Sequence, residues 1–347
     1  MPLTQRAATL RGPEALTLDT CPVADPGPGE VRLRVTAALV GGTAAEIWRR
    51  GRHPRGGRAP SPFGHEGAGV IDAIGPGVTG WKPGDAVLAA GGVPCGTCEF
   101  CRRGSAGQCD ATVWLLGYAG ERLVVPAPIV QRSLHRLPDG LAPERAALAW
   151  ELACVLKGFD RSPVGAGRTA VVIGAGAAGL LWVRTLSKAG ARVVAVDRRR
   201  GRLEKAKSLG AFETVDVSTS DDVGHLVRTK TEGGIGADLV VECAGTIEAW
   251  ERAAGIVRRG GTVHLYGAPR GRARLQVPPE RVHGDEVTFL SSFHHGPEHV
   301  VQALHLLAGG FVDASLFLEE SAPVTRLSSV LGRIASGEGP IKASIKV

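Results

Sequence analysis

The sequence predicts an α/β fold with two domains, a β-barrel-like domain followed by a doubly wound parallel sheet. Three observations support this prediction. The chain has 347 residues, more than a single ordinary hydrophobic core accommodates. Residues 1–155 read as short β-type segments separated by Gly and Pro. From Arg168 onward, β-branched runs alternate with helical patterns, which is typical of a parallel sheet covered on both faces.

In the first region, turn-rich connectors such as PGPGE (Pro26–Glu30) and GPGVTGWKPGD (Gly75–Asp85) separate short strands. The predicted strands there are Val31–Ala38, Gly67–Ile74, Asp85–Ala89 and Glu121–Val125. After the change of character near Gly158, the predicted strands are Thr169–Ile173, Arg192–Val196, Asp238–Glu242 and Gly261–Leu265. The predicted helices are Ala177–Lys188, Arg202–Leu209 and Pro297–Ala308.

The composition excludes several classes of protein. Hydrophobic residues make up 44% and charged residues 22%, which is normal for a globular protein. The net charge is +7, but aromatic residues are only 5% and no basic face with interleaved aromatics is evident, so we expect no nucleic-acid partner. No apolar run reaches the length of a membrane span, and Met1–Arg11 lacks the apolar core of a signal peptide. We therefore expect a cytoplasmic protein with a small-molecule partner.

Four clustered cysteines predict a metal site. Their spacing is C-x2-C-x2-C-x7-C, and four thiolates from one loop suit a closed tetrahedral zinc site with no open coordination position. Such a zinc is structural. An iron–sulfur cluster fits less well because the last interval differs from the ferredoxin spacings, and disulfides are the remaining alternative. The four ligands are Cys95, Cys98, Cys101 and Cys109.

A glycine fingerprint predicts a dinucleotide site. Gly174-x-Gly176-x-x-Gly179 follows a buried-type strand and opens a helix, and this context makes the pattern specific. The first glycine permits a tight turn, the second lets the backbone approach a pyrophosphate, and the third permits close helix–strand packing. The amides that open the helix, including those of Ala177 and Ala178, supply donors at its positive end.

The choice between NAD(H) and NADP(H) depends on two conflicting signals. Asp197 ends the strand after the fingerprint helix, where a carboxylate binds the adenosine ribose hydroxyls and repels a 2′-phosphate. Arg198, Arg199 and Arg200 follow at once and offer positive charge for such a phosphate, or form an exposed helix start. We favour NAD(H) because the acid stands at the strand end.

With these motifs, the chain resembles the zinc-containing medium-chain alcohol and polyol dehydrogenases over essentially its full length. GHEGAGVI (Gly64–Ile71), GDAV (Gly84–Val87), the four-cysteine loop, the glycine fingerprint and GADLVVECAG (Gly236–Gly245) occur in the family's order. The resemblance implies a GroES-like catalytic domain of residues 1–157 and 296–347 and a Rossmann domain of residues 158–295. It also implies cofactor contacts at Ala244 and Gly267, and a homodimer or homotetramer.

The family usually holds a second, catalytic zinc, and here its ligand pattern is degenerate. Gly41 stands where the family has a ligand Cys, and Ala44 stands where an Asp orients the ligand His. Trp150 stands in the register of a ligand Glu, so that His65 and Glu66 alone remain. Because Gly and Trp side chains do not ligate zinc, we expect the structural zinc without the catalytic one. The alternative is a rearranged metal site that uses His65, Glu66, Glu151 and Cys154.

Without that metal, side chains must supply the proton transfer that accompanies hydride transfer. Thr43 occupies the family's hydroxyl position, and His65 is freed from ligation. Glu66 and Glu151 are candidate acid/base groups. Glu46 stands where some members carry a relay residue, although a surface carboxylate on a short helix explains it equally well.

The function that these residues predict is an NAD(P)(H)-dependent oxidoreductase. It transfers hydride to or from a small-molecule carbonyl, alcohol or activated double bond, with a structural zinc and without a catalytic one. Two alternatives stay open. One is a zinc-dependent alcohol or cyclitol dehydrogenase with rearranged ligands, and the other is a dinucleotide-binding protein without turnover.

Overall fold

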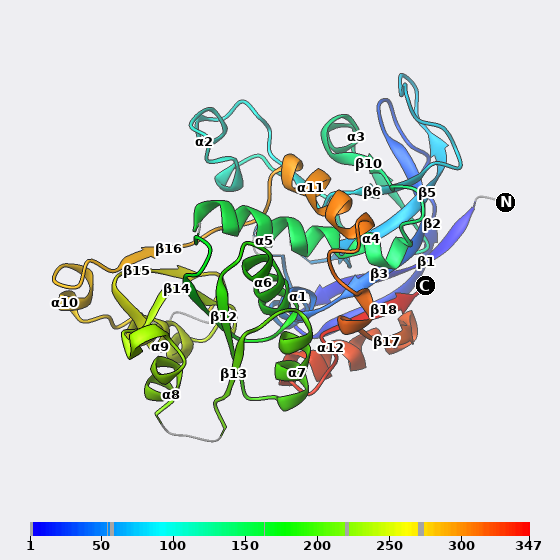
Figure 1. Ribbon diagram of the computed structural model, residues 1–347. Coiled ribbons are helices and arrows are strands. Elements are labelled where there is room, and N and C mark those ends of the chain that lie inside the picture. Colours follow the sequence, from blue (N-terminus) through cyan, green and yellow to red (C-terminus); the bar gives the residue numbers. More distant parts are fainter. Residues whose placement is uncertain (1–2, 54, 56–58, 163, 219–221, 270–273) are drawn as a thin grey trace. The chain divides into compact units, whose positions relative to one another are not determined.

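The computed structural model describes residues 3–53, 55, 59–162, 164–218, 222–269 and 274–347 (Figure 1). The chain forms two compact units. Unit 1 comprises Met1–Ala153 and His295–Val347, and unit 2 comprises Cys154–His294. Helix α5 (Ala149–Arg161) runs through the first boundary between them.

Unit 1 is built from β-sheets. A seven-stranded sheet has the order β10-β6-β5-β3-β18-β17, and β9 also pairs with β3. Its strands are β10 (Leu134–Arg136), β6 (Ala86–Ala89), β5 (Glu66–Ile74), β3 (Val31–Val40), β18 (Lys342–Lys346), β17 (Leu318–Pro323) and β9 (Arg122–Val125). The other strands form a sheet ordered β2-β1-β4 and a β7-β8 pair. Their bounds are β1 Thr4–Gly12, β2 Ala15–Pro22, β4 Ser61–Pro62, β7 Gly92–Val93 and β8 Val113–Trp114. This arrangement confirms the GroES-like, β-rich domain.

Helices cover the sheets of unit 1 and connect them. They are α1 (Gly42–Arg50), α2 (Glu99–Arg102), α3 (Ala127–Ser133), α4 (Pro143–Ala147), the first turns of α5, α11 (Pro297–Ala308) and α12 (Leu327–Ser336). The core beneath them is apolar, with Val31, Leu33 and Ile71 almost fully buried. Tyr118 is also fully buried and satisfies its hydroxyl by donating to the Ala89 carbonyl at 2.9 Å.

Three strand ends meet in unit 1, and this meeting point positions the candidate site. In the seven-stranded sheet, Leu39 near the end of β3 pairs with Glu66 at the start of β5. Leu39 pairs on its other side with Ser344 of β18, and this strand begins at Lys342. The C-terminal strand therefore brings its first residue to the edge of the sheet where β3 ends and β5 begins.

Unit 2 is a doubly wound parallel sheet, as predicted. Its order is β13-β12-β11-β14-β15-β16 and every adjacent pair is parallel. The strands are β11 (Thr169–Ile173), β12 (Arg192–Asp197), β13 (Glu213–Asp216), β14 (Ala237–Glu242), β15 (Val257–Leu265) and β16 (Thr288–Leu290). The helices are α6 (Ala177–Lys188), α7 (Arg200–Ser208), α8 (Val223–Thr229), α9 (Ile247–Ile256) and α10 (Pro279–Val282). Figure 1 shows α6 and α7 on one side of this sheet and α8 and α9 on the other.

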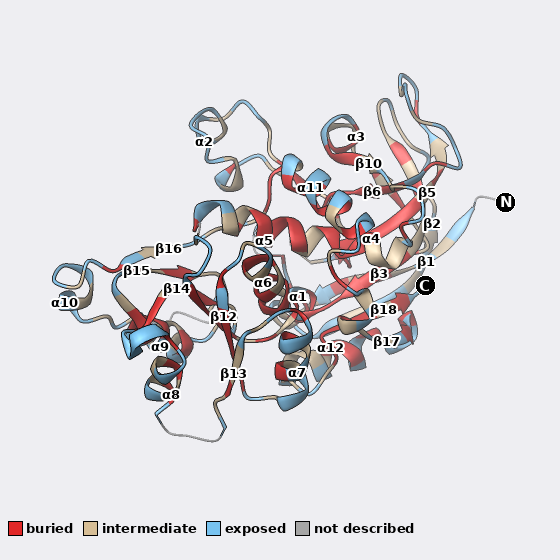
Figure 2. Cartoon of the chain, viewed as in Figure 1, coloured by how far each residue is buried: buried red, intermediate tan, exposed pale blue. Residues whose placement is uncertain are grey.

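Burial follows from this layering. All five residues of β11 are buried, as expected for a central strand with both faces covered. Figure 2 shows α5 and the central strands of each unit largely in the colour of buried residues. Most predicted elements begin within two residues of the observed ones, but β15 begins four residues before the predicted Gly261, because its pairing with β14 continues across a register shift.

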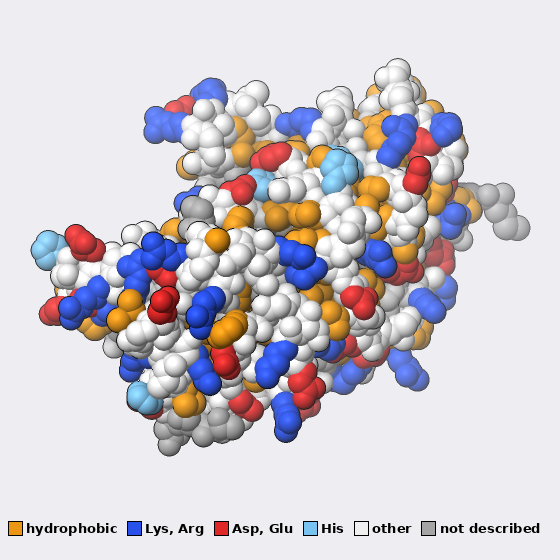
Figure 3. Space-filling model, in the orientation of Figure 1, with side chains coloured by type: hydrophobic (Ala, Val, Ile, Leu, Met, Phe, Trp, Pro, Cys, Tyr) orange, Lys and Arg blue, Asp and Glu red, His pale blue; other side chains and the backbone are white. Residues whose placement is uncertain are grey.

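The surface shown in Figure 3 mixes charges of both signs. Lys and Arg side chains alternate with Asp and Glu over this face, and they do not gather into a single basic patch. Within the described part of the chain, no helix combines the length and the apolar character needed to cross a membrane.

Candidate functional site

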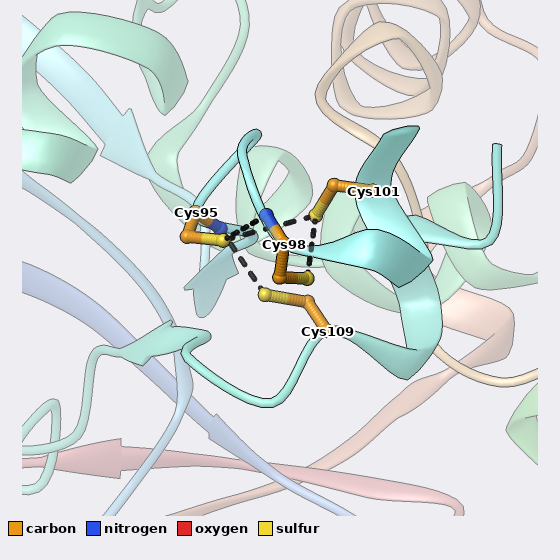
Figure 4. Close-up of side chains that lie close together, drawn as sticks. All are labelled: Cys95, Cys98, Cys101 and Cys109. Atoms are coloured by element: carbon orange, nitrogen blue, oxygen red, sulfur yellow. Dashed lines mark hydrogen bonds between the residues drawn. The ribbon is translucent and has the colours of Figure 1, made fainter. Parts of the chain in front are cut away.

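The four cysteines come together as the spacing predicted. Their sulfur atoms all lie within 4.8 Å of one another, on the loop that carries α2 (Figure 4). Backbone N–H groups of Thr97 and Cys98 donate to the Cys95 sulfur at 3.4 and 3.3 Å, and these bonds lower the pKa of Cys95 to about 6. Four convergent sulfurs with amide donors suit a tetrahedral zinc, so the residues fit this metal.

The glycine fingerprint forms the turn between β11 and α6, and two of its three glycines are required by the backbone. Gly174 has φ +93°, and Gly179 approaches so closely that an added Cβ would lie 1.7 Å from the Gly174 carbonyl oxygen. Gly176 differs from both, because its φ is ordinary and the nearest protein atom to an added Cβ is Nη1 of Arg202 at 3.7 Å. Protein packing would therefore tolerate a side chain at Gly176. A glycine is expected at such a position if the free space next to its backbone is meant for a bound pyrophosphate.

Asp197 lies beside this loop at the end of β12. Its carboxylate accepts from the Ala175 N–H at 2.7 Å and from the Arg199 N–H at 2.9 Å, and the Arg199 guanidinium lies 3.4 Å away. Asp197 is buried, whereas Arg198 is exposed. The acid therefore orders the fingerprint turn, and the nearby arginines keep positive charge at the same edge.

The loops after β14 and β15 lie beside the glycine fingerprint, since a Cβ at Gly174 would lie 2.8 Å from the Ala244 nitrogen. Glu242, at the end of β14, accepts from the amides of Ala244 and Gly245 at 2.6 and 2.8 Å. Burial raises the pKa of Glu242 to about 7 against those two hydrogen bonds. A Cβ at Gly267 would lie 2.5 Å from the Gly245 nitrogen, so the two loops touch. β14 and β12 flank β11 on opposite sides, which is the switch point where open α/β sheets bind ligands.

In unit 1, His65 is buried in an aromatic and charged setting. Its ring meets the Trp150 indole edge-on, with centroids 4.6 Å apart. Its Nε2 lies 3.5 Å from a Glu66 oxygen and has no hydrogen-bond partner among the described residues. Burial, together with the charge of Lys342, lowers the pKa of His65 to about 3, so its imidazole is neutral.

Glu66 and Glu151 converge on a cation that the sequence did not reveal. Nζ of Lys342 lies 2.5 Å from Oε2 of Glu66 and 2.5 Å from Oε2 of Glu151. The side chains of Lys342 and Glu66 are each 1% exposed, and that of Glu151 is 16% exposed. Burial alone lowers the pKa of Lys342, but the two carboxylates outweigh it and hold the pKa above its usual value. Lys342 is therefore a buried ammonium.

The other two predicted side chains lie on α1. Thr43 is exposed in its first turn, immediately after the Gly41–Gly42 helix start. Glu46 points toward its own helix, with one oxygen 2.6 Å from Nε of Arg50. This ion pair favours the interpretation of Glu46 as a surface carboxylate.

A second, catalytic zinc does not fit these residues. Gly41 offers no ligand, and a Cβ placed there would lie 3.2 Å from Nζ of Lys342. Trp150 offers an indole N–H, which is a donor only, and it packs so closely that its Nε1 would lie 2.4 Å from a Cβ at Gly91. Among the described residues, the four cysteines form the only group of three or more ligand side chains that could hold a metal.

The sequence reasoning missed two cations. Lys342 has a weak signal, since two glutamates in apolar runs need a counter-charge, but nothing in the sequence says which lysine supplies it. Arg202, at the start of α7, lies near Gly176. In the sequence, Arg202 comes after the strand that follows the fingerprint helix. A cation at that position could have been suspected to lie near a phosphate site.

Known proteins resemble this chain in both units. A model of the alcohol dehydrogenase GroES-like domain matches residues 27–139, and a model of the zinc-binding dehydrogenase domain matches residues 177–309. The protein named "Probable D-xylulose reductase A" of Neosartorya fischeri is 31% identical over 82% of this chain and 81% of its own length. Sorbitol dehydrogenase of Bacillus subtilis is 27% identical over 96% of this chain and 94% of its own.

The fold has solved counterparts as well. A candidate zinc-binding dehydrogenase of Sinorhizobium meliloti, solved with NADP bound, superposes with a TM-score of 0.89. It is 25% identical, and the match covers 99% of this chain and 100% of that one.

Proposed function

Because the chain belongs to the zinc-containing medium-chain alcohol and polyol dehydrogenases and is an NAD(P)-dependent oxidoreductase, we propose that it transfers hydride without a metal at the reacting atoms. One observation carries this proposal. Of the three positions that hold the family's catalytic metal, Gly41 and Trp150 offer no ligand atom and His65 alone keeps one. The four-cysteine loop is assigned a structural zinc.

The cofactor supplies or accepts the hydride, and we propose NAD(H) rather than NADP(H). The carboxylate of Asp197, buried at the end of β12, favours ribose hydroxyls over a 2′-phosphate. The opposing signals are the neighbouring Arg198 and the NADP bound to the Sinorhizobium meliloti relative. Titration of the purified protein with both reduced cofactors distinguishes them, and tighter binding of NADPH would reverse the assignment.

Within unit 1, the contacts and exposure of each acid/base candidate favour a particular role for it. Glu66 and Glu151 are held by Lys342, so we assign them to the shape and charge of the site rather than to direct proton transfer. Thr43 is exposed and carries a hydroxyl that can donate to, or accept from, a substrate oxygen. His65 is buried and its lowered pKa keeps the imidazole neutral, so it is suited to hydrogen-bond a substrate oxygen rather than to take up the proton.

The substrate class follows from this chemistry. A metal-free site gives less help to charge that develops on an oxygen, so substrates with an acidic hydroxyl or an activated double bond suit it. The names of the relatives put polyols and their ketoses in the first screening panel. Substrates of both kinds are small molecules that carry a carbonyl, an alcohol or a conjugated bond.

Assembly and compartment complete the proposal. β16 ends the sheet of unit 2, and an edge strand is a ready surface for pairing with a second copy, so we propose a homodimer. Light scattering at micromolar concentration tests this, and a monomer would refute it. Cysteines that serve as metal ligands rather than disulfides suit the reducing cytoplasm.

The decisive experiment follows nicotinamide absorbance with the substrate panel before and after dialysis against a strong chelator. Metal analysis of the same sample verifies that the four-cysteine zinc is retained. We expect turnover to survive. Complete inhibition with that zinc still present would show that a second metal takes part and would replace this proposal with a rearranged zinc site.

A further inference from the structure

We propose that unit 2 carries a second ligand site, for a small organic phosphate, in a cavity whose charged wall lies at the end of the parallel sheet opposite the glycine fingerprint. The cavity has a volume of about 370 Å³, within the range of sites that hold small organic molecules. All of its lining residues belong to unit 2. The inference goes beyond the proposed function, because it concerns neither the hydride transfer nor the dinucleotide.

The charged wall of the cavity is separate from the cofactor edge. Arg168 immediately precedes β11, Asp238 is the second residue of β14, and Arg258 is the second residue of β15. These strands are parallel, so the three side chains start from their amino ends, whereas Gly174 follows the carboxyl end of β11. A strand of five residues such as β11 spans about 16 Å, which leaves room for a ligand at each end.

Arginine side chains give the cavity its charge. Arg161, the last residue of α5, lines it together with Arg168 and Arg258. Among the described lining residues Asp238 is the single acid, so three positive charges face one negative charge. A guanidinium presents its donors in a planar fork that matches the oxygens of a phosphate. This surplus of positive charge favours an anionic ligand.

The acid in the wall is already held by the protein. Asp238 accepts from Nε of Arg258 at 2.9 Å and from the Thr169 N–H at 2.9 Å. Arg258 also donates from Nη1 to the Arg259 carbonyl at 2.6 Å, and its side chain is 29% exposed. These contacts fix Arg258 and Asp238 as a rigid back wall, and they offset one of the three positive charges.

The other two arginines keep donors for a ligand. Nη1 of Arg168 lies 3.7 Å from Asp238, beyond a hydrogen bond, and the Arg168 side chain is 65% exposed. Within the described part of the chain, the guanidinium of Arg161 forms neither a hydrogen bond nor an ion pair. A ligand anion would therefore find two guanidinium groups that are not yet committed to protein acceptors.

The remaining walls suit an organic body rather than a bare ion. Leu239, Leu290 and Val164 line the cavity with apolar atoms. Leu239 pairs with Thr262 across β14 and β15, so both side chains stand on the same face of the sheet. The Thr262 hydroxyl adds a polar group beside these apolar walls. An ester of phosphate fits this division, with its anion on the arginines and its carbon skeleton on the leucines.

The test is isothermal titration calorimetry of the full chain with phenyl phosphate, a phosphate monoester with an apolar body. The titration is made with the tighter-binding reduced nicotinamide cofactor at saturation, so that the dinucleotide site is filled. We expect one saturable equivalent, with inorganic phosphate binding more weakly because it has no apolar body. Inorganic phosphate binding as tightly would overturn the assignment to an organic phosphate, and so would the absence of saturable binding by phenyl phosphate.

Two variants locate the site. Arg161→Gln and Arg168→Gln each remove a charged donor, and each should weaken phenyl phosphate at least ~10-fold. Arg252→Gln is the matched control, since it removes an exposed arginine of α9 that does not line the cavity, and it should leave the affinity unchanged. An affinity for Arg161→Gln equal to that of the control would overturn the inference.

The outcomes separate this site from the proposed function. Binding of phenyl phosphate that disappears when the cofactor is added would place the anion at the dinucleotide site and overturn the inference. Normal cofactor binding and turnover without any binding of phenyl phosphate would refute this site and leave the proposed function standing. Arginine-dependent binding in a protein that fails to turn over would support the site and count only against the proposed function.

Discussion

Replacing Lys342 by Met should destabilise the protein strongly in metal-free buffer. The change keeps most of the side-chain volume and removes the ammonium, leaving Glu66 buried without its partner. Removing one member of a buried ion pair typically costs about 3–5 kcal/mol, because the charge left behind is uncompensated. We expect a loss in this range, since Glu66 is 1% exposed and cannot turn to solvent, whereas Glu151 at 16% can reach some water.

The assay is urea unfolding at pH 7 with a chelator present. Lys342→Met with Glu66→Gln removes the ammonium and the more buried carboxylate together, so it should recover at least ~2 kcal/mol of the loss. Lys346→Met, an exposed change on the same strand, should stay within about 0.5 kcal/mol of the native protein. A single variant Lys342→Met within ~1 kcal/mol of native would refute the reasoning, because a buried pair of this kind would then not be present.

The pH dependence of this difference has a definite sign. The folded-state pKa of Lys342 is raised above its unfolded value of 10.5. The contribution of the ammonium is therefore fully present below pH 10.5 and is lost as the pH rises through the folded pKa. The gap between the native protein and Lys342→Met should stay constant from neutral pH to about pH 10 and narrow only above it.

Four further changes test other parts of the account. Cys98→Ser should release the structural zinc and lower the melting temperature, as followed by metal analysis and calorimetry, because structural zinc binding is coupled to folding. Asp197→Ala should weaken NADH binding relative to NADPH in fluorescence titrations; an unchanged ratio would remove this residue from cofactor choice. Thr43→Val should lower the rate of the chemical step by ~10²–10⁴-fold with cofactor binding nearly intact, and full activity would exclude the hydroxyl. Glu242 has a pKa raised from 4.5 to about 7, so the folded state holds its proton more tightly and stability falls as the pH rises through that window. Glu242→Gln should remove that fall, which amounts to roughly 3 kcal/mol, in unfolding curves measured from about pH 4 to about pH 8.

The features that the sequence predicted well are local. The strand–turn–helix around Gly174 and the four-cysteine loop each lie within a few turns of chain, so spacing alone fixes their geometry. The parallel sheet followed from alternating patterns, since each strand is followed by its helix. The loss of ligand side chains at Gly41 and Trp150 could also be read from the sequence, because the residue types alone show that neither side chain ligates zinc.

The feature that could not be predicted depends on contacts between distant segments. Lys342 is separated from Glu66 by 276 residues, and only the pairing of β18 with β3 brings them together. In the sequence, Lys342 and Lys346 look alike, yet one is buried and the other is exposed. The sequence therefore left the roles of Glu66 and Glu151 open. A glutamate that is bound to an ammonium looks the same in a sequence as a glutamate that acts as a general base.

The central claim is that this oxidoreductase keeps a structural zinc and has exchanged its catalytic zinc for protein side chains. Elemental analysis of the folded, chelator-dialysed protein tests it most directly, with the protein concentration determined independently. The account predicts one tightly held zinc per chain, bound by the four-cysteine loop that includes Cys95 and Cys109. Two tightly held zinc ions per chain would contradict it.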